Sequence, residues 1–179
     1  MSERETTFAW ETPPELWRGL KPGAAWNGSV VSLYIAPEPA GPMISVAEVR
    51  ALADRGLEGD RFFRGSWAAA KRPDKAVSLI EEEVLDMAAA EHQVTIAGEK
   101  TRRNILTRGV PLIELLDRDF MIGNVVMRGI RLFEPCAHLE KVSHISGIFR
   151  ALENRSGLKA AILSDGVIRT GDPIALAGR

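Results

Sequence analysis

The sequence has 179 residues and a formal net charge of −1; 45% of its residues are hydrophobic and 26% are charged. This composition is typical of a globular protein with one sizeable core, and the near-zero charge argues against a general binder of nucleic acids or anionic membranes. The only cysteine has no partner for an intramolecular disulfide, and no stretch approaches the roughly 20 apolar residues of a membrane-spanning helix. We therefore expect a cytoplasmic protein with a reduced thiol and with no nucleic-acid or membrane partner.

Residues 1–27 are predicted to form an N-terminal arm ahead of one domain at residues 28–179. The arm is polar, contains several prolines and lacks a clear periodicity. It nevertheless carries Trp10, Trp17 and Trp26, and a disordered tail rarely has three indoles. We expect the arm to pack against another surface.

From residue 28 onwards the pattern is mainly that of short strands separated by turns. Strands are predicted at 28–36 and 43–52, at the start of 76–92, on both sides of the Gly123-Asn124 turn within 120–134, and around Asp165-Gly166 and Gly171-Asp172 within 158–176. Helices are predicted in the rest of 76–92, where Ser78 and Glu81 fit a capping box, in 109–116 from Pro111, and in 145–157 up to Gly157. Many short strands with few short helices predict a mainly β (α+β) protein built on a β-barrel.

The single cysteine, Cys136, lies in FEPCAHLEK (133–141), just past a predicted strand. A free cysteine is often a small buried hydrophobe, whereas a position after a strand is where functional groups are commonly displayed. His138 would support a thiolate if residues 136–138 stay extended, since side chains two residues apart then share a face. A surface or helix-start histidine is an equally good interpretation. Spacing alone leaves open a core residue, a nucleophile and a metal ligand.

A structural zinc site is not expected, because such a site needs four ligands and the sequence has one Cys and three scattered His. A soft metal held by one thiolate, with most of its ligands supplied by a cofactor, remains open.

Basic side chains gather in two loops, one of which follows a sharp turn predicted at Gly56 and Gly59. These side chains are Arg61, Arg64, Lys71, Arg72, Lys75, Arg102 and Arg103. Such runs are usually solvated surface, but arginines with backbone amides also suit phosphate. Neither loop contains a Walker A motif or a dinucleotide fingerprint. Any phosphate site would therefore use another arrangement.

Several segments, taken in order, resemble the MOSC domain, named for the C-terminal module of molybdenum-cofactor sulfurases. They are GLEGDR (56–61), VSLIEEEVL (77–85), GEKTRRNILTRGVPLIEL (98–115), FMIGNVVMRGIRLFEPCAHLE (120–140) and GLKAAILSDGVIRTGDPI (157–174), and the resemblance extends over about residues 28–176. It implies a small stand-alone protein with a mixed β-barrel, associated with the pterin-based molybdenum cofactor (molybdopterin). The family cysteine is thought to carry sulfur or to ligate molybdenum. In the related amidoxime-reducing enzymes it coordinates the metal, and some stand-alone bacterial members reduce N-hydroxylated base analogues.

Carried onto this sequence, the resemblance implies that Cys136 is the catalytic thiol or the molybdenum ligand, with His138 tuning it. Arg61, Arg102 and Arg103 would bind the cofactor phosphate, and Asn104 would order their loop. Many members read G-E-x-G-E-N where this chain has residues 98–104, and the two extra cations here could strengthen phosphate binding or mark a subgroup with another ligand.

Two kinds of function follow from the resemblance. One is an enzyme that transfers sulfur or reduces an N-hydroxylated substrate, served by a redox or sulfur-donor protein. The alternative is a non-catalytic module that delivers the cofactor or sulfur to a partner enzyme.

Overall fold

The computed structural model describes residues 26–63 and 72–178, so nearly all of the predicted arm, together with Arg64 and Lys71, lies outside the described residues. The strands are β1 (Gly28–Ile35), β2 (Ile44–Val46), β3 (Glu48–Leu52), β4 (Gly56–Leu57), β5 (Val77–Glu81), β6 (Ile105–Arg108), β7 (Asp119–Ile122), β8 (Val125–Leu132), β9 (Leu158–Ile162), β10 (Gly166–Arg169) and β11 (Pro173–Leu176). The α-helices are α2 (Glu82–His92), α3 (Ala137–Ser143) and α4 (Ile148–Leu152), and the 3₁₀ turns are η2 (Pro73–Lys75), η3 (Gly98–Thr101) and η4 (Leu112–Leu115).

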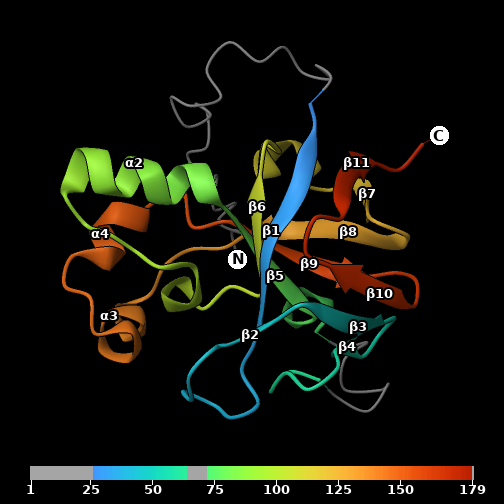
Figure 1. The fold of residues 1–179 in the computed structure, drawn as a ribbon, viewed down its shortest axis with the longest axis horizontal. Coiled ribbons are helices and arrows are strands. Elements are labelled where there is room, and N and C mark those ends of the chain that lie inside the picture. Colours follow the sequence, from blue (N-terminus) through green and yellow to red (C-terminus); the bar gives the residue numbers. More distant parts are fainter. Residues whose placement is uncertain (1–25, 64–71, 179) are drawn as a thin grey trace, which may run out of the picture.

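Seven of the described strands close into a barrel, which confirms the predicted mainly β fold (Figure 1). Around the barrel the order is β1, β11, β7, β8, β9, β5, β6 and back to β1. Neighbours in the ring are antiparallel except for β5 and β6, which are parallel, so the barrel is mixed. Outside the ring, β2 pairs with β1, and β3 joins β10 and β4 in a separate three-stranded sheet.

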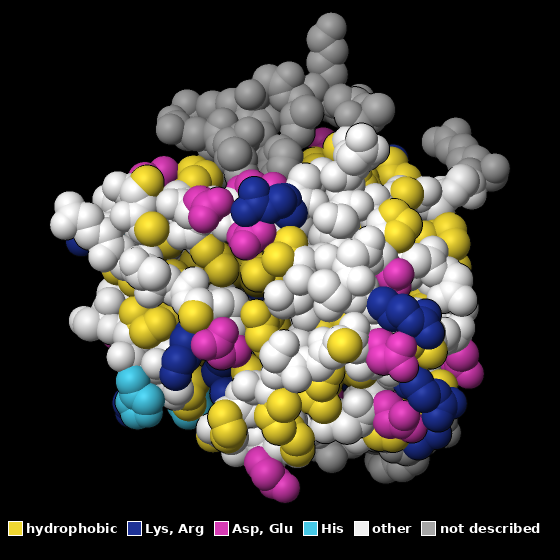
Figure 2. Space-filling model, viewed as in Figure 1, with side chains coloured by type: hydrophobic (Ala, Val, Ile, Leu, Met, Phe, Trp, Pro, Cys, Tyr) yellow, Lys and Arg dark blue, Asp and Glu magenta, His cyan; other side chains and the backbone are white. Residues whose placement is uncertain are grey.

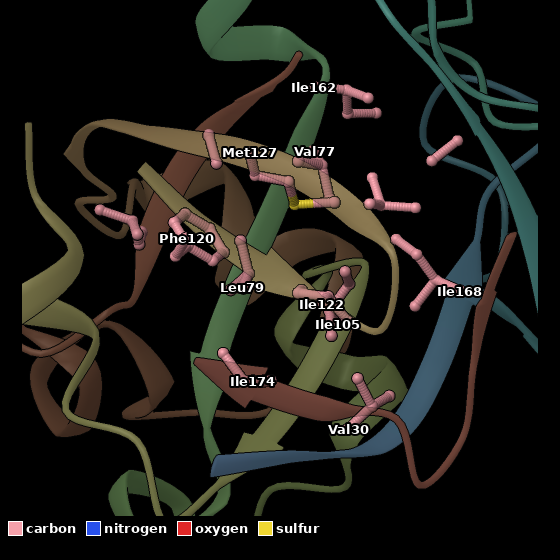
Figure 3. Close-up of a cluster of buried hydrophobic side chains, with 14 of the residues drawn as sticks. Val30, Val77, Leu79, Ile105, Phe120, Ile122, Met127, Ile162, Ile168 and Ile174 are labelled. Atoms are coloured by element: carbon pink, nitrogen blue, oxygen red, sulfur yellow. The ribbon is translucent and has the colours of Figure 1, made fainter. Parts of the chain in front are cut away.

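Apolar side chains from every side of the ring fill the barrel interior. Figure 3 shows Phe120 of β7, Leu79 of β5, Ile105 of β6 and Met127 of β8 gathered there, and none of the four is accessible to solvent. Full burial of one such side chain stabilises the folded state by about 1.5–3 kcal/mol relative to exposure. The strand ends that carry the site are therefore held by a tightly packed core.

A second apolar cluster lies between the barrel and the helices α2, α3 and α4, which Figure 1 shows together on one side. Leu79 and Ile105 belong to the barrel interior, whereas their chain neighbours Ile80 and Leu106 belong to the helix-side cluster. Both faces of β5 are thus buried. Even its two polar residues, Ser78 and Glu81, are buried.

The strand predicted at 43–52 is two strands in the structure. Its first part, β2, pairs with β1, whereas the second part, β3, pairs with β10 and β4. The chain changes sheet at Ala47, which lies between them. The less exposed positions change phase between the two parts, from Val46 in β2 to Val49 and Ala51 in β3.

The predicted capping box of Ser78 and Glu81 is wrong. Ser78 lies inside β5, and its hydroxyl donates a hydrogen bond to Asn104 Oδ1 at 2.9 Å, so it is not free to cap a helix. Helix α2 begins at Glu82, with Glu81 as its N-cap and without a side-chain cap bond. The strand is longer than predicted because β5 is paired on both sides.

The helix predicted at 145–157 is shorter, and an additional helix precedes it. The structure has α4 at Ile148–Leu152, while α3 at Ala137–Ser143 was not predicted. Gly157 does not end a helix. It adopts a φ of +99° and lies so close to the Leu79 carbonyl that a Cβ would clash with it. The glycine is needed for this close approach to β5.

Acidic and basic side chains lie next to each other at several places on the face shown in Figure 2. The ion pairs of the surface include Arg108 with Glu82 at 2.7 Å and Arg128 with Asp119 at 2.6 Å. These pairs are solvent-exposed and therefore screened by salt. Among the described helices, none has the length and apolar character of a membrane span.

Candidate functional site

A pocket with a volume of about 120 Å³ lies where residues around β5, β6, β8 and β9 meet. Its lining consists of Arg61, Phe62, Asp74, Lys75, Val77, Ser78, Arg102, Asn104, Phe133 and Lys159. Three of the residues predicted to serve the cofactor, Arg61, Arg102 and Asn104, come together here from distant parts of the sequence. The structure places Arg103 elsewhere, as described below.

The G-D-R turn is fixed by a buried carboxylate, Asp60. Its Oδ2 accepts hydrogen bonds from the Ala36 backbone N–H at 3.0 Å and from the Asn104 amide at 3.1 Å, and its Oδ1 accepts one from the Phe62 N–H at 3.0 Å. The Arg61 N–H donates to the Ala36 carbonyl at 2.7 Å. These bonds hold Arg61 and Phe62 at the pocket wall. The predicted turn glycine Gly59 has a φ of +84°, which its lack of a Cβ permits.

Asn104 joins three segments at the base of the pocket. Its Oδ1 accepts bonds from the backbone N–H and the hydroxyl of Ser78, at 3.1 and 2.9 Å. Its Nδ2 donates to the Tyr34 carbonyl at 3.2 Å as well as to Asp60. Both donors and the acceptor of this side chain are therefore used within the protein, which fits an ordering role in the loop.

Arg102 lies beside Arg61 and presents a second guanidinium to the pocket. Its backbone is in the left-handed region, with a φ of +61°, and its Nη1 donates to the Gly41 carbonyl at 2.7 Å. Partial burial lowers the pKa of Arg102, the charge of Arg61 lowers it further, and Asp60 opposes this shift. Two neighbouring cations with one buried counter-charge form an electropositive wall that suits an anion such as phosphate.

A second group of charges lies around Phe133, just after β8. Lys159 of β9 places its Nζ 4.3 Å from the Phe133 ring centroid, and Lys75 places its own 5.5 Å from the Phe62 centroid. Burial, followed by the charge of Arg131, lowers the pKa of Lys159 to about 8. Asp74 raises this pKa, while Arg103 and Lys75 lower it further.

Arg103 is buried rather than exposed to the pocket. Its Nε donates to the Ser156 carbonyl at 3.0 Å, its Nη1 to the Thr101 carbonyl at 2.7 Å, and its Nη2 to the Ser156 hydroxyl. Its guanidinium stacks on Phe133, 3.5 Å from the ring centroid. Most of its donors are therefore already used by the protein, and phosphate binding by Arg103 stays a prediction.

The charge of Arg103 is coupled to the thiol. Burial lowers the pKa of Arg103 to about 9, while the negative charges of Cys136 and Glu134 oppose that shift. Arg103 therefore remains a cation at neutral pH. Its hydrogen-bond acceptors, the Ser156 and Thr101 carbonyls and the Ser156 hydroxyl, are all neutral.

Cys136 is exposed, follows the buried Pro135, and forms the N-cap of α3 in an extended conformation with φ of −128° and ψ of 157°. The structure thus excludes the buried small hydrophobe as its role. His138 is exposed in the first turn of α3. Because the helix begins at Ala137, residues 136–138 are not extended, and the expected shared face does not form. The helix-start interpretation of His138 is the one observed.

Sequence reasoning missed the aromatic walls and one cation of the site. Phe62 and Phe133 each adjoin a motif that was recognised, G-D-R or P-C, and their proximity to these motifs was a usable signal. Lys159 stands within the otherwise apolar strand LKAAI, where a charged side chain directed to a cavity is unusual. Asp74 gave no signal, since it lies in a polar turn. In the described part of the chain, no cluster of three or more His, Cys, Asp or Glu is arranged to hold a metal.

The fold and the site together define a small mixed-barrel protein with a basic, aromatic-walled pocket and an accessible thiol. The family model of the MOSC domain matches residues 54–175, and the chain belongs to this family. MOSC domains are associated with functions of the molybdenum cofactor. No protein with a curated description matches the sequence.

Crystal structures of bacterial proteins share the fold. The YuaD protein from Bacillus subtilis is 19% identical with a TM-score of 0.68, over 84% of this chain and 97% of that one. YiiM from Geobacillus stearothermophilus is 18% identical with a TM-score of 0.65, over 85% and 76% of the two chains. YiiM from Escherichia coli is 20% identical with a TM-score of 0.61, over 87% and 71%. At such low sequence identity, the similarity establishes a shared fold and nothing more.

Proposed function

We propose that this protein binds the molybdenum cofactor, or a related phosphorylated pterin, in the pocket, with Cys136 at the molybdenum or carrying sulfur beside it. The observation that supports this most is that the guanidiniums of Arg61 and Arg102 share one pocket lining with the aromatic side chains of Phe62 and Phe133. Cys136 lies outside this lining, and its charge acts on Arg103, which stacks on Phe133.

The residues present fit such a group. Paired guanidiniums suit a phosphate, aromatic rings suit a planar heterocycle, and a thiolate suits molybdenum or sulfane sulfur. Glu134 has a buried carboxylate oxygen, Oε1, without a hydrogen-bond partner among the described residues. A buried acceptor of this kind needs a ligand or a water to complete it. When bound, the cofactor would supply a redox-active molybdenum centre.

The protein's own residues would then have distinct roles. Arg61 and Arg102 bind the phosphate, while Asp60 and Asn104 hold their loops in place through buried hydrogen bonds. Arg103 stabilises negative charge on Cys136 rather than contacting the phosphate, because its donors are directed to Ser156 and Thr101. His138 remains a candidate for tuning the thiol from the first turn of α3.

The test is anaerobic loading with molybdenum cofactor, followed by desalting and quantitation of retained molybdenum and pterin per chain. We expect the wild type to retain both in equal amounts, and Arg102→Ala to lose both at least tenfold, since it loses one of two phosphate contacts. If the thiol is a metal ligand, Cys136→Ser should keep the pterin with its molybdenum, because the cofactor supplies most of the metal's ligands, and X-ray absorption should show one sulfur ligand fewer on the metal. Arg118→Ala, a change at an exposed arginine outside the pocket lining, serves as the control. Retention of neither component by the wild type would sink the cofactor hypothesis.

A carrier function is the second candidate, and the exposure of Cys136 favours it, because a thiol that hands over sulfur must be reachable by another protein. The loaded wild type would then show no turnover of N-hydroxylated substrates with an external reductant, yet would reactivate a cofactor-free partner enzyme. An enzyme would instead turn over and lose that activity in Cys136→Ser. In either case we expect a redox or sulfur-donor partner and a cytoplasmic location.

A further inference from the structure

The positive charges of the pocket fall into two separate groups. In the first, Arg102 is influenced by Arg61 and Asp60. In the second, Lys159 is influenced by Arg131, Asp74, Arg103 and Lys75. The first group comes from the G-D-R turn and the loop before β6, whereas the second comes from η2, β8 and β9 together with the buried Arg103.

The second group is held together by strand register. Lys159 of β9 lies directly across from Arg131 on β8 and from Ser78 on β5. Like charges placed directly opposite on neighbouring strands repel each other. Arg131 is partly neutralised, because its Nη2 donates to Asp74 Oδ2 at 3.1 Å. Within the described part of the chain, Lys159 itself forms no ion pair within 4.0 Å; Asp74, which is paired with Arg131, is the anion that acts on it at longer range.

Phe62 connects the two groups. Its ring has the guanidinium of Arg61 at 4.6 Å and the ammonium of Lys75 at 5.5 Å from the same centroid. A ligand bound beside this ring is therefore within reach of a cation of each group. A single phosphate would occupy one of them and leave the other without an anion.

We propose that the pocket binds two anionic groups at once, one at Arg61 and Arg102 and the other at Lys75 and Lys159. On the proposed function, on which this assignment to substrate rests, the cofactor phosphate occupies the first position. The second position selects substrates that carry a carboxylate or a phosphate on a planar ring system. Neutral analogues of the same shape are bound more weakly.

Proton uptake accompanies occupation of the second position. The groups that face Lys159 are Arg131, Arg103 and Lys75, which are cationic, and Asp74, which is anionic. A bound anion favours the charged ammonium and raises the pKa of Lys159 above its value of about 8. Near pH 8, where the free amine is about half protonated, binding takes up roughly half a proton. Affinity for the second anion falls as the pH rises above this value.

The probes are guanosine 5′-monophosphate and guanosine 3′,5′-bisphosphate, measured by isothermal titration calorimetry on the full chain without cofactor. Titration at pH 8 in two buffers of different ionisation enthalpy gives the proton uptake. We expect the bisphosphate to bind at least tenfold more tightly, with uptake of protons. Lys159→Met should abolish both the tenfold advantage and the proton uptake while leaving the monophosphate affinity unchanged. Arg102→Ala should weaken both ligands, and Lys141→Met, at an exposed lysine outside the pocket lining, should change nothing.

Equal affinities for the two nucleotides, or an advantage that survives in Lys159→Met, would overturn the inference. Lys159→Arg keeps the charge and should keep most of the advantage without the proton uptake, which separates an electrostatic role from a loss of folding. The proposed function is tested separately, by the measurement of cofactor retention. A chain that retains cofactor but does not discriminate between the nucleotides refutes only the second anion position.

Discussion

Asn104 is the residue on which the geometry of the pocket depends most. Its amide contacts Ser78 on β5, the Tyr34 carbonyl on β1 and the Asp60 carboxylate in the G-D-R turn. No water is needed to complete these bonds, because both ends of the amide have protein partners. Removing the side chain would leave buried groups of three segments unsatisfied at the same time.

Asn104→Ala should lower the free energy of unfolding by about 3 kcal/mol or more, because several buried polar groups lose their partners together. Urea denaturation followed by circular dichroism measures this change. Asn27→Ala, at an exposed asparagine, is the matched control and should shift stability by less than about 0.5 kcal/mol. A loss of under about 1 kcal/mol in Asn104→Ala would mean that the loops are held by other contacts.

For Arg103 the sequence motif identifies the residue but not the contacts of its side chain. The sequence pairs it with Arg102 in one basic loop, and both therefore look alike as phosphate ligands. In the structure Arg102 takes a left-handed backbone conformation, after which Arg103 is buried against Phe133 and Ser156. The direction of the second side chain depends on residues about 30 to 50 positions later, which no local pattern contains.

At the scale of an element, the junction between β5 and α2 contains a buried acid. Glu81 is 6% exposed, and its Oε1 accepts a hydrogen bond from the Leu112 backbone N–H at 3.1 Å. Burial, helped by the neighbouring charge of Glu83, raises the pKa of Glu81 to about 7. Glu81 and Glu83 together tether the segment at Gly109–Leu112 to this junction.

The free energy of unfolding should fall as the pH rises through the pKa of Glu81. Because the pKa is raised in the folded state, the folded protein holds the proton between pH 4.5 and about 7 while the unfolded chain has lost it. The contribution of this proton to the free energy of unfolding is fully present below pH 4.5 and is lost progressively as the pH rises to about 7. It amounts to about 3 kcal/mol.

Glu81→Gln removes this titration and should therefore be more stable than the wild type at pH 8, with a flatter dependence of unfolding free energy between pH 5 and 7. Chemical denaturation over that pH range measures it. Glu153→Gln, at an exposed acid, should follow the wild-type curve. If the unfolding free energies of Glu81→Gln and the wild type changed with pH in parallel, Glu81 would be ionised in the folded protein without a loss of stability.

At the scale of the whole molecule, the barrel brings together segments that are far apart in the chain. β1 closes the ring by pairing with both β6 and β11, so residues from the first and last thirds of the domain share one core. Strand positions were largely predictable, since apolar runs and turn residues such as Gly123-Asn124 are local features. The pairing of β5 with β6 in parallel, and the change of sheet after β2, are not local and were not predicted.

The same distinction applies to the site. Cys136, Arg61 and Arg102 were found because they lie in recognisable motifs, and the structure places Arg61 and Arg102 in the pocket lining. Phe133 and Lys159 join the pocket through the register of β8 and β9, which a single sequence does not determine. His138 was expected to share a face with Cys136 if residues 136–138 were extended. Helix α3 begins at Ala137, so these residues are not extended.

The central claim is that the cofactor occupies the pocket directly beside Cys136. The most direct measurement is the rate at which iodoacetamide alkylates Cys136, followed by mass spectrometry, with and without bound molybdenum cofactor. Because the free thiol is exposed, we expect rapid labelling of the chain alone and at least tenfold slower labelling of the loaded chain. Arg102→Ala treated with cofactor should be labelled as fast as the free wild type. An unchanged rate in wild type that demonstrably retains cofactor would contradict the account, because the thiol and the bound cofactor would then be apart.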